Sequence, residues 1–179
     1  VDTSRTDVDN VTQTWWWQVI SQAGCLIEKN DSYSGATVSY HGYDNQDYSS
    51  RSFITRLPRL GSPDVIFIFG GTNDDWLEVP VGSLQYEKRT DLDLKQILPA
   101  YCEMLSYTVE NNPQAAIFAV INTDMKPSTI RSMQEACAHY HVHCVTLHDI
   151  SKQCGHPDRL GMRQIADPID EARGEGEGE

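Results

Sequence analysis

The sequence predicts an α/β fold in which helices cover both faces of a parallel β-sheet, in a three-layer α/β/α arrangement. Two apolar runs of strand length, 64–69 and 115–121, contain almost no polar side chains. Continuous apolar strands are typical of sheets buried on both faces, and such sheets are parallel. Segments with helical spacing of apolar residues separate these runs, which is the alternation that a parallel sheet requires.

The first half of the chain contains predicted helices and strands in alternation. Val11, Trp15 and Val19 recur at helical spacing, and Gly24 then provides a helix stop. Pro63 precedes a run of apolar residues and marks the start of a strand. In chain order, we expect a helix over 9–24, a strand over 25–28, a helix over 48–60 and a strand over 64–69.

The second half continues the same alternation. Pro99 must lie in the first turn of its helix or bend it, and Pro127 is well placed to open the next one. In chain order, we expect a helix over 94–111, a strand over 115–121, a helix over 127–140, a strand over 142–147 and a helix over 157–166.

The composition is that of one folded domain with an acidic surface. The 179 residues are 39% hydrophobic and carry a net charge of −12. A chain of this length can bury a sizeable core, and we expect a single domain over residues 1–170. The negative charge argues against nucleic acid or an anionic membrane surface as a partner, and no apolar run reaches the roughly 18 residues of a membrane span. Residues 171–179 end in alternating Gly and Glu, so we expect a mobile, solvated tail.

The cysteines and histidines do not form a recognisable metal pattern. The five cysteines are an odd number without a Cys-x-x-Cys spacing, so we expect neither a disulfide scaffold nor a zinc knuckle. His139, His141 and His143 alternate around the start of a predicted strand, as metal ligands can. No carboxylate or thiol pattern accompanies them, so we expect no metal site there.

Glycines and polar residues follow the predicted strands, which is where ligands bind in open α/β sheets. Gly-Gly-Thr-Asn-Asp occupies 70–74, Gly35 lies in the loop after the strand at 25–28, and His156 lies beyond the last strand. The Gly35 N–H and the Asn73 amide could stabilise an oxyanion, with His156 as general base. Each also has a purely structural interpretation, because Gly and Asn are common in turns and His156 precedes a proline at a helix start.

At these residues the chain resembles the SGNH hydrolases, or GDSL-type esterases. Residues 30–37 resemble the family's second block, 71–74 (Gly-Thr-Asn-Asp) the third and 155–157 (Gly-His-Pro) the fifth, in the right order over nearly the whole chain. The resemblance implies a flavodoxin-like parallel sheet, Gly35 and Asn73 as oxyanion donors, and His156 as the base that activates a serine. It also implies an ester substrate, either a small molecule or a glycan, and no metal or organic cofactor.

The chain departs from the family pattern at two catalytic positions. The family's first block, a Gly-Asp-Ser turn that ends the first strand, has no counterpart before residue 30, so we expect that strand and its nucleophile to be missing. Residues 30–32 (Asn-Asp-Ser) superficially resemble this turn, but no second block would then follow them. Ser34 is the best internal substitute for the nucleophile. The family's acid lies three residues before the histidine, where this chain has Gln153, so Asp149 is the nearest carboxylate.

These observations leave two functions from different classes. The first is an SGNH-type esterase that removes acyl groups, for example acetyl groups of carbohydrates, through an acyl-enzyme. The second is a truncated or catalytically inactive domain that at most binds a small ligand. A sheet that lacks a strand exposes backbone groups and apolar surface, so the second function also predicts low stability or self-association. A flavodoxin-like binding domain fits less well, because no phosphate-binding glycine loop follows the first strand.

Overall fold

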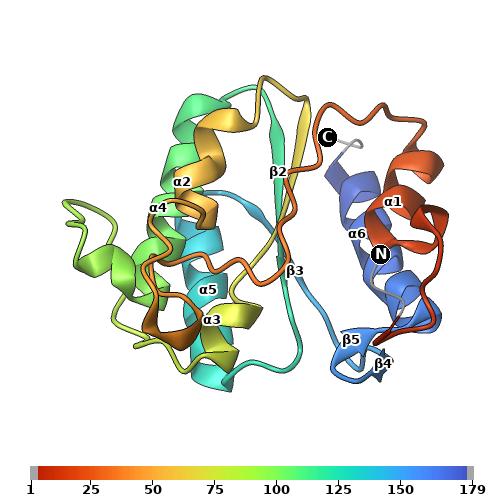
Figure 1. The fold of residues 1–179 in the computed structure, drawn as a ribbon. Helices are drawn as coiled ribbons and strands as arrows, with labels where there is room; N and C mark the ends of the chain where they lie inside the picture. Colours follow the sequence, from red (N-terminus) through yellow and green to blue (C-terminus); the bar gives the residue numbers. More distant parts are fainter. Residues whose placement is uncertain (1–3, 177–179) are drawn as a thin grey trace. The chain divides into compact units, whose positions relative to one another are not determined.

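The chain forms two compact units in the computed structural model, which describes residues 4–176 (Figure 1). The central unit comprises Glu28–Cys144. The terminal unit comprises Val1–Ile27 and Val145–Glu179, of which 4–27 and 145–176 are described. The terminal unit therefore joins segments from opposite ends of the sequence.

A parallel sheet confirms the predicted α/β class. Strands β1 (Val65–Phe69) and β2 (Ala116–Ile121) run parallel with Phe67 opposite Phe118, and β3 (His143–Thr146) completes the order β1-β2-β3. All of β2 after its first residue is buried, which explains its continuous apolar sequence.

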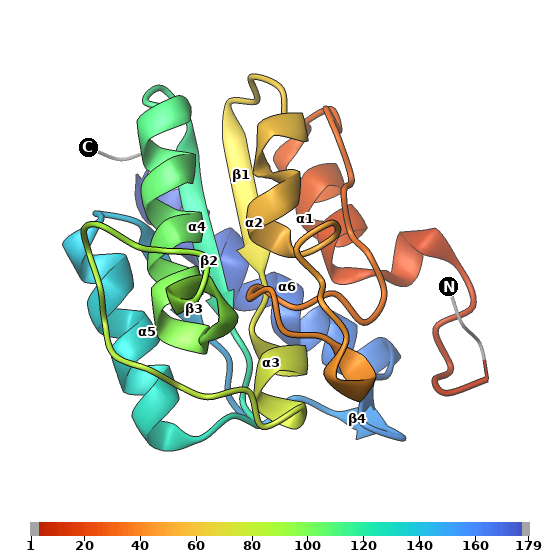
Figure 2. The same cartoon turned by 60° about the vertical axis from the view of Figure 1, so that its left-hand side comes forward.

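Helices of the central unit cover the sheet and supply much of its core. Figure 2 shows α2 and α4 lying in front of β1 and β2, with α5 beside α4. Tyr101, Met104 and Leu105 of α4 are buried, and Pro99 lies in its first turn, where a helix does not need the missing N–H. The elements are α2 (Phe53–Arg56), α3 (Thr72–Trp76), α4 (Ile97–Asn111) and α5 (Pro127–His139), with 3₁₀ turns η2 (Tyr43–Asn45), η3 (Leu57–Arg59) and η4 (Asp93–Lys95).

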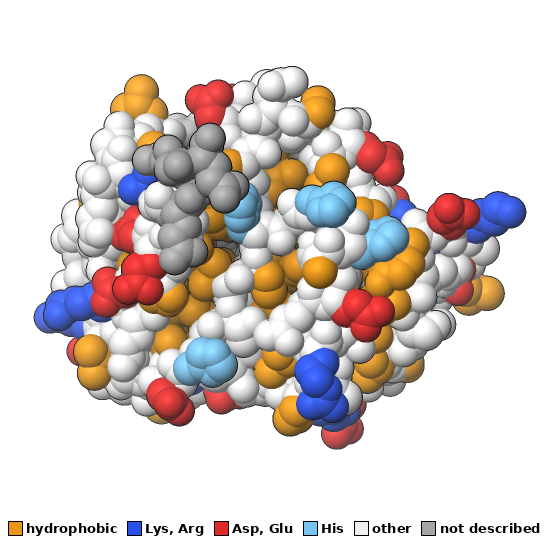
Figure 3. All heavy atoms as spheres, turned by 180° about the vertical axis from the view of Figure 1, so that it is seen from behind, with side chains coloured by type: hydrophobic (Ala, Val, Ile, Leu, Met, Phe, Trp, Pro, Cys, Tyr) orange, Lys and Arg blue, Asp and Glu red, His pale blue; other side chains and the backbone are white. Residues whose placement is uncertain are grey.

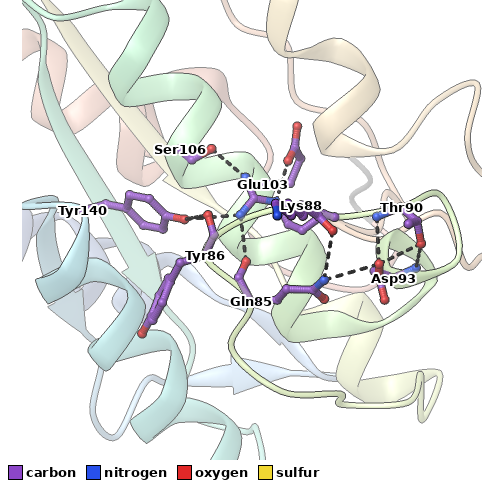
Figure 4. Close-up of polar contacts among 9 residues, drawn as sticks. Gln85, Tyr86, Lys88, Thr90, Asp93, Glu103, Ser106 and Tyr140 are labelled. Atoms are coloured by element: carbon purple, nitrogen blue, oxygen red, sulfur yellow. Dashed lines mark hydrogen bonds and ion pairs between the residues drawn. The ribbon is translucent and has the colours of Figure 1, made fainter.

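Arg89 fastens the long loop between α3 and α4 to α4 itself; Figure 4 labels its partners Gln85, Glu103, Ser106 and Tyr140. Its guanidinium donates to the Glu103 carboxylate at 2.6 Å and to the Ser106 hydroxyl at 2.8 Å. It also donates to the Gln85 carbonyl oxygen at 2.7 Å and lies 3.4 Å from the Tyr140 hydroxyl. Because the Arg89 side chain is only 9% exposed, this loop is an integral part of the central unit.

The terminal unit is built on two helices that pack against each other, α1 (Trp15–Ala23) and α6 (Arg159–Gly176). Val19 of α1 and Ile165 of α6 are buried. Gly24 ends α1 with a left-handed φ of 64°, as the sequence predicts. The remaining elements are η1 (Val11–Gln13) and an antiparallel pair, β4 (Lys152–Gln153) and β5 (His156–Pro157).

Apolar side chains are exposed at the end of α1. Hydrophobic side chains reach the surface on the face shown in Figure 3, and Leu26 of the terminal unit is 95% exposed. The rings of Trp16 and Trp17 meet edge to face, with centroids 5.9 Å apart. Both line a small pocket of about 190 Å³ together with apolar residues of 20–27.

Several expected elements differ from the structure. The helices expected over 9–24 and 94–111 begin only at Trp15 and Ile97, each after a separate 3₁₀ turn. Residues 25–28 form no strand, because exposed side chains such as Leu26 gain no burial from pairing. The helix expected over 48–60 begins only at Phe53, where Ser52 caps it, and tightens into a 3₁₀ turn at Pro58.

The last helix is also longer than expected, since α6 runs from Arg159 to Gly176 instead of 157–166. Of the tail expected at 171–179, residues 171–176 are therefore helical, and 177–179 lie outside the described residues. The single domain expected over 1–170 remains a prediction. Among the described residues, no helix is long and apolar enough to cross a membrane.

Candidate functional site

The turn after β1 needs both of its glycines. A Cβ at Gly70 would lie 2.7 Å from the Phe53 ring and 2.9 Å from Val38, so no larger residue fits without displacing the core. Gly71 has a φ of 100°, a backbone conformation that favours glycine, and it starts α3. This tight turn places the following residues, Thr72 to Asp74, in the first turn of α3.

The Asn73 side chain is held at both ends of its amide. Its Nδ2 donates to the Ala36 carbonyl oxygen at 2.8 Å, and its Oδ1 accepts from the Tyr43 hydroxyl at 2.9 Å. An amide nitrogen carries two hydrogens, and no described residue accepts the second one. Asn73 is half-buried, so this N–H can still meet a ligand.

Gly35 lies next to the residue that Asn73 contacts. Its φ is 73°, and the Ala36 N–H donates back to the Tyr33 carbonyl oxygen, so a turn surrounds it. No described residue accepts the Gly35 N–H. The positive φ of this turn would by itself account for a glycine at position 35, which is the purely structural interpretation given above. The structure nevertheless brings the predicted donors Gly35 and Asn73 into one neighbourhood of the central unit.

Asp74 links the two loops that carry these donors. Its carboxylate is fully buried and accepts the backbone N–H groups of Val38 at 2.8 Å and Ser39 at 3.0 Å. Burial raises the pKa of Asp74, although the hydrogen bonds from Ser39 and Val38 oppose that rise. In the sequence, Asp74 stands out only as the last residue of the motif at 70–74. An acidic residue gives no sign in the sequence that it accepts hydrogen bonds from residues so far away.

Ser34 is exposed beside Gly35 and has no hydrogen-bond partner among the described residues. A serine nucleophile needs a base within hydrogen-bond reach. No base of the central unit meets this requirement, so the role of Ser34 stays a prediction without support from its contacts.

His156 lies in the terminal unit, where a tight hairpin positions it. Gln153 of β4 pairs with His156 of β5, and the connecting residues Cys154 and Gly155 both have positive φ, at 47° and 77°. Two such residues are typical of a type I′ hairpin turn. The Nη1 atom of Arg5 lies 3.4 Å from Nε2 of His156.

The carboxylates near His156 differ in their surroundings. Asp149 is exposed and has no hydrogen-bond or ion-pair partner among the described residues, so its orienting role stays a prediction. Asp158 accepts from the Ser151 hydroxyl at 2.6 Å and from the Gly161 N–H at 2.8 Å. The hydrogen bond from Ser151 is the largest cause, and together with that from Gly161 it lowers the pKa of Asp158.

In the part of the chain that the structure describes, no group of three or more His, Cys, Asp or Glu side chains is arranged to hold a metal ion. Two of the alternating histidines instead stack on aromatic rings. His139 lies on Tyr86 with a centroid distance of 3.7 Å, and His143 lies on Phe118 at 4.7 Å.

Comparisons with known proteins agree with these motifs. The sequence model of the family GDSL-like Lipase/Acylhydrolase matches residues 1–172. Among curated proteins, the chain has no match. A candidate GDSL-like lipase from Bacteroides uniformis is 42% identical with a TM-score of 0.93, and the match covers 96% of this chain and 81% of that one.

Two further solved structures extend the comparison. A candidate GDSL-like lipase from Bacteroides ovatus is 42% identical with a TM-score of 0.91, over 95% of this chain and 82% of that one. A family two carbohydrate esterase from Clostridium thermocellum, in complex with cellohexaose, is 18% identical with a TM-score of 0.64, over 98% of this chain and 59% of that one. At this identity the esterase shares only the fold. The family match over residues 1–172 and the two Bacteroides structures show that the chain belongs to the GDSL-like lipase/acylhydrolase family of SGNH hydrolases.

Proposed function

We propose that the chain is an SGNH-type ester hydrolase domain whose oxyanion donors are the Gly35 N–H and the Asn73 amide. One observation carries the proposal: the Asn73 amide is bonded to the Ala36 carbonyl, directly beside Gly35, and each donor keeps an N–H that no described residue accepts. Donors fixed in advance at the developing negative charge are usually the largest single contribution to acyl transfer.

The remaining roles follow the serine esterase mechanism. A serine oxygen attacks the ester carbonyl while His156 takes its proton, and the tetrahedral oxyanion meets Gly35 and Asn73. The ester C–O bond then breaks, His156 returns the proton to the leaving alcohol, and water hydrolyses the acyl-enzyme. Ser34 and Asp149 are the internal candidates for nucleophile and orienting acid.

For the substrate we propose an uncharged ester, of a small molecule or of a glycan. The carbohydrate esterase with bound cellohexaose shares this fold, which supports a glycan ester. The net charge of −12 would repel anionic substrates and so supports a neutral one.

The alternative is a catalytically inactive domain that binds an ester or its product without turning it over. The exposed Ser34 favours it, because no base of the central unit contacts this hydroxyl and the sequence has no Gly-Asp-Ser turn. On these grounds we expect the 179-residue chain to hydrolyse p-nitrophenyl acetate no faster than its His156→Ala variant. The DNA upstream of the Val1 codon provides a further test, because an in-frame apolar strand followed by Gly-Asp-Ser would supply the nucleophile.

Two measurements test the proposal and separate it from the alternative. In an NMR titration with acetate, the product of an acetyl esterase, the Gly35 backbone amide and Asn73 side-chain amide signals should shift together and saturate, and Asn73→Ala should abolish the shift at Gly35. Unmoved signals would refute the oxyanion site. Fluorophosphonate labelling with mass mapping then identifies the nucleophile. A labelled serine, together with turnover that requires His156, would establish the enzyme. If no serine is labelled and no turnover is seen, only the inactive domain remains.

A further inference from the structure

We propose that Tyr43 is a positioning residue of this site, which orients the Asn73 amide and supports the Gly35 turn. The inference rests on the proposed function, because it assigns the geometry of the same two donors. Tyr43 lies outside the three motifs named above, at 30–37, 71–74 and 155–157.

The Tyr43 hydroxyl and the Ala36 carbonyl hold the two ends of the Asn73 amide. It donates to Oδ1 at 2.9 Å, while Nδ2 donates to the Ala36 carbonyl oxygen at 2.8 Å. Rotating the amide by 180° would place Oδ1 against the Ala36 oxygen, so that two acceptors would face each other. The Tyr43 hydroxyl would then have to accept from Nδ2 instead of donating to Oδ1. The Ala36 carbonyl therefore selects the orientation in which an N–H is left for a ligand, and the Tyr43 hydroxyl holds the amide oxygen in it.

The same hydrogen bond also strengthens the donor. A hydroxyl that donates to an amide oxygen polarises the amide, and hydrogen bonds in such chains reinforce one another by about 10–30% per bond. The spare N–H of Asn73 thus becomes a better donor to an oxyanion while Tyr43 holds Oδ1.

The ring of Tyr43 reaches the other donor. A Cβ at Gly35 would lie 3.7 Å from Cε2 of Tyr43, which is ordinary van der Waals contact and is the nearest contact of that position. Cε2 is adjacent to the carbon that carries the hydroxyl. One half-buried side chain therefore places its ring beside the Gly35 turn and bonds Asn73 with its hydroxyl.

The backbone around Tyr43 is held in an unusual conformation. Asp44 and Asn45 are both left-handed, with φ of 54°, a state that costs most residues roughly 1–2 kcal/mol although Asn and Asp tolerate it best. Gly42 has no room for a side chain, because a Cβ there would lie 2.2 Å from the Tyr48 ring.

Hydrogen bonds close this loop on both sides. The Gly42 N–H donates to Gln46 O at 2.9 Å, and the Tyr48 N–H donates to Tyr40 O at 2.7 Å. A loop closed in this way presents Tyr43 at a fixed place, as a positioning residue requires.

The first test uses NMR and needs no turnover. Tyr43→Phe keeps the ring and removes the hydroxyl, and Tyr33→Phe is the matched control, because Tyr33 lies in the Gly35 loop and is 55% exposed. In Tyr43→Phe the two Asn73 side-chain amide proton signals should shift and approach each other, while backbone amides of α4 stay in place. In Tyr33→Phe the Asn73 signals should stay in place. Unchanged Asn73 signals in Tyr43→Phe would overturn the proposal.

The second test measures the consequence for binding and catalysis. Tyr43→Phe should weaken acetate binding about fivefold, the size of one neutral hydrogen bond, and where turnover is present it should lower kcat by a similar factor without changing KM. Combined with Asn73→Ala, it should add no further loss. A purely structural role predicts instead a lower unfolding midpoint with unchanged binding and kcat, and this result would also overturn the proposal. If Asn73→Ala itself changes neither quantity, the proposed function fails, while the NMR signals still decide whether Tyr43 orients the amide.

Discussion

Replacing Arg89 by Met should destabilise the central unit far more than breaking an exposed ion pair. The guanidinium makes three hydrogen bonds of 2.6 to 2.8 Å, to Glu103, Ser106 and Gln85, and its side chain is 9% exposed (Figure 4). Burial opposes the charge on Arg89, but the hydrogen bond to Glu103, the charge of Glu103 and the contact with Tyr140 together outweigh burial and raise the pKa of the guanidinium. Methionine retains the aliphatic stem and removes every donor.

The expected loss is about 3 kcal/mol in the free energy of unfolding. Breaking a buried pair by removing one partner typically costs about 3–5 kcal/mol, because the other charge stays uncompensated. The Glu103 side chain is 33% exposed, so water can solvate part of its charge and the low end of that range applies. The double variant Arg89→Met, Glu103→Gln should therefore be more stable than Arg89→Met alone.

Urea unfolding followed by circular dichroism measures these differences. With a slope of about 1–3 kcal/mol per molar urea, the midpoint of Arg89→Met should fall by roughly 1 M or more. The control is Asp9→Asn, which breaks the exposed pair between Arg159 and Asp9, whose side chains are 48% and 59% exposed. It should cost no more than about 1 kcal/mol. An Arg89→Met midpoint equal to that of the control would refute the view that this cluster fastens the loop to α4.

Three further predictions concern the turn, the donor and the terminal unit. Gly70→Ala should cost about 1–3 kcal/mol by overpacking, because its Cβ would lie 2.7 Å from an aromatic carbon of Phe53. The control Gly174→Ala in α6 meets no atom within 4 Å and should be neutral or stabilising, and thermal unfolding distinguishes the two variants. In a chain with a working nucleophile, Asn73→Ala should lower kcat by about 10²–10³ while the free energy of unfolding changes by only about 1–2 kcal/mol, and unchanged turnover would remove Asn73 from the mechanism. Because the pKa of Asp158 is lowered in the folded chain, its ionised form stabilises the fold above the ordinary pKa of 3.8, and this stability is lost as pH falls through the folded pKa. Ser151→Ala should therefore flatten the acid limb of a curve of unfolding free energy against pH, and an unaltered limb would contradict this.

The sequence predicted the parallel sheet because β1 and β2 are apolar along their whole length. The run at 115–121 became β2, and Pro99 and Pro127 lie in the first turns of their helices as expected. Two of the errors could not have been avoided by reading local composition. Residues 25–28 are mostly apolar, but their side chains are exposed. Residues 171–176 have a low-complexity composition but continue α6. Local composition could not predict either outcome, because the contacts of the folded chain decide both.

At the candidate site, the sequence predicted single residues better than the contacts between them. The Gly-Gly-Thr-Asn-Asp motif identified the turn after β1, and the positive φ of Gly71 and Gly35 agrees with the choice of glycine. The bonds from Tyr43 to Asn73 and from Asn73 to Ala36 join residues 30 and 37 positions apart. No periodicity or spacing rule reaches that far, so the support around the donors was visible only in the structure.

Asp74 helps to fix the geometry of the two proposed donors at the expense of stability. Because its folded pKa lies above the ordinary 3.8, the folded chain binds a proton there more tightly than the unfolded chain does. Stability therefore falls as pH rises from the unfolded pKa through the folded one, so ionising this buried carboxyl group is a net cost. Its hydrogen bonds to the N–H groups of Val38 and Ser39 indicate the compensating benefit. Asn73 precedes Asp74 in α3, and Gly35 precedes the segment that Asp74 holds, so this one carboxylate keeps the two proposed oxyanion donors next to each other.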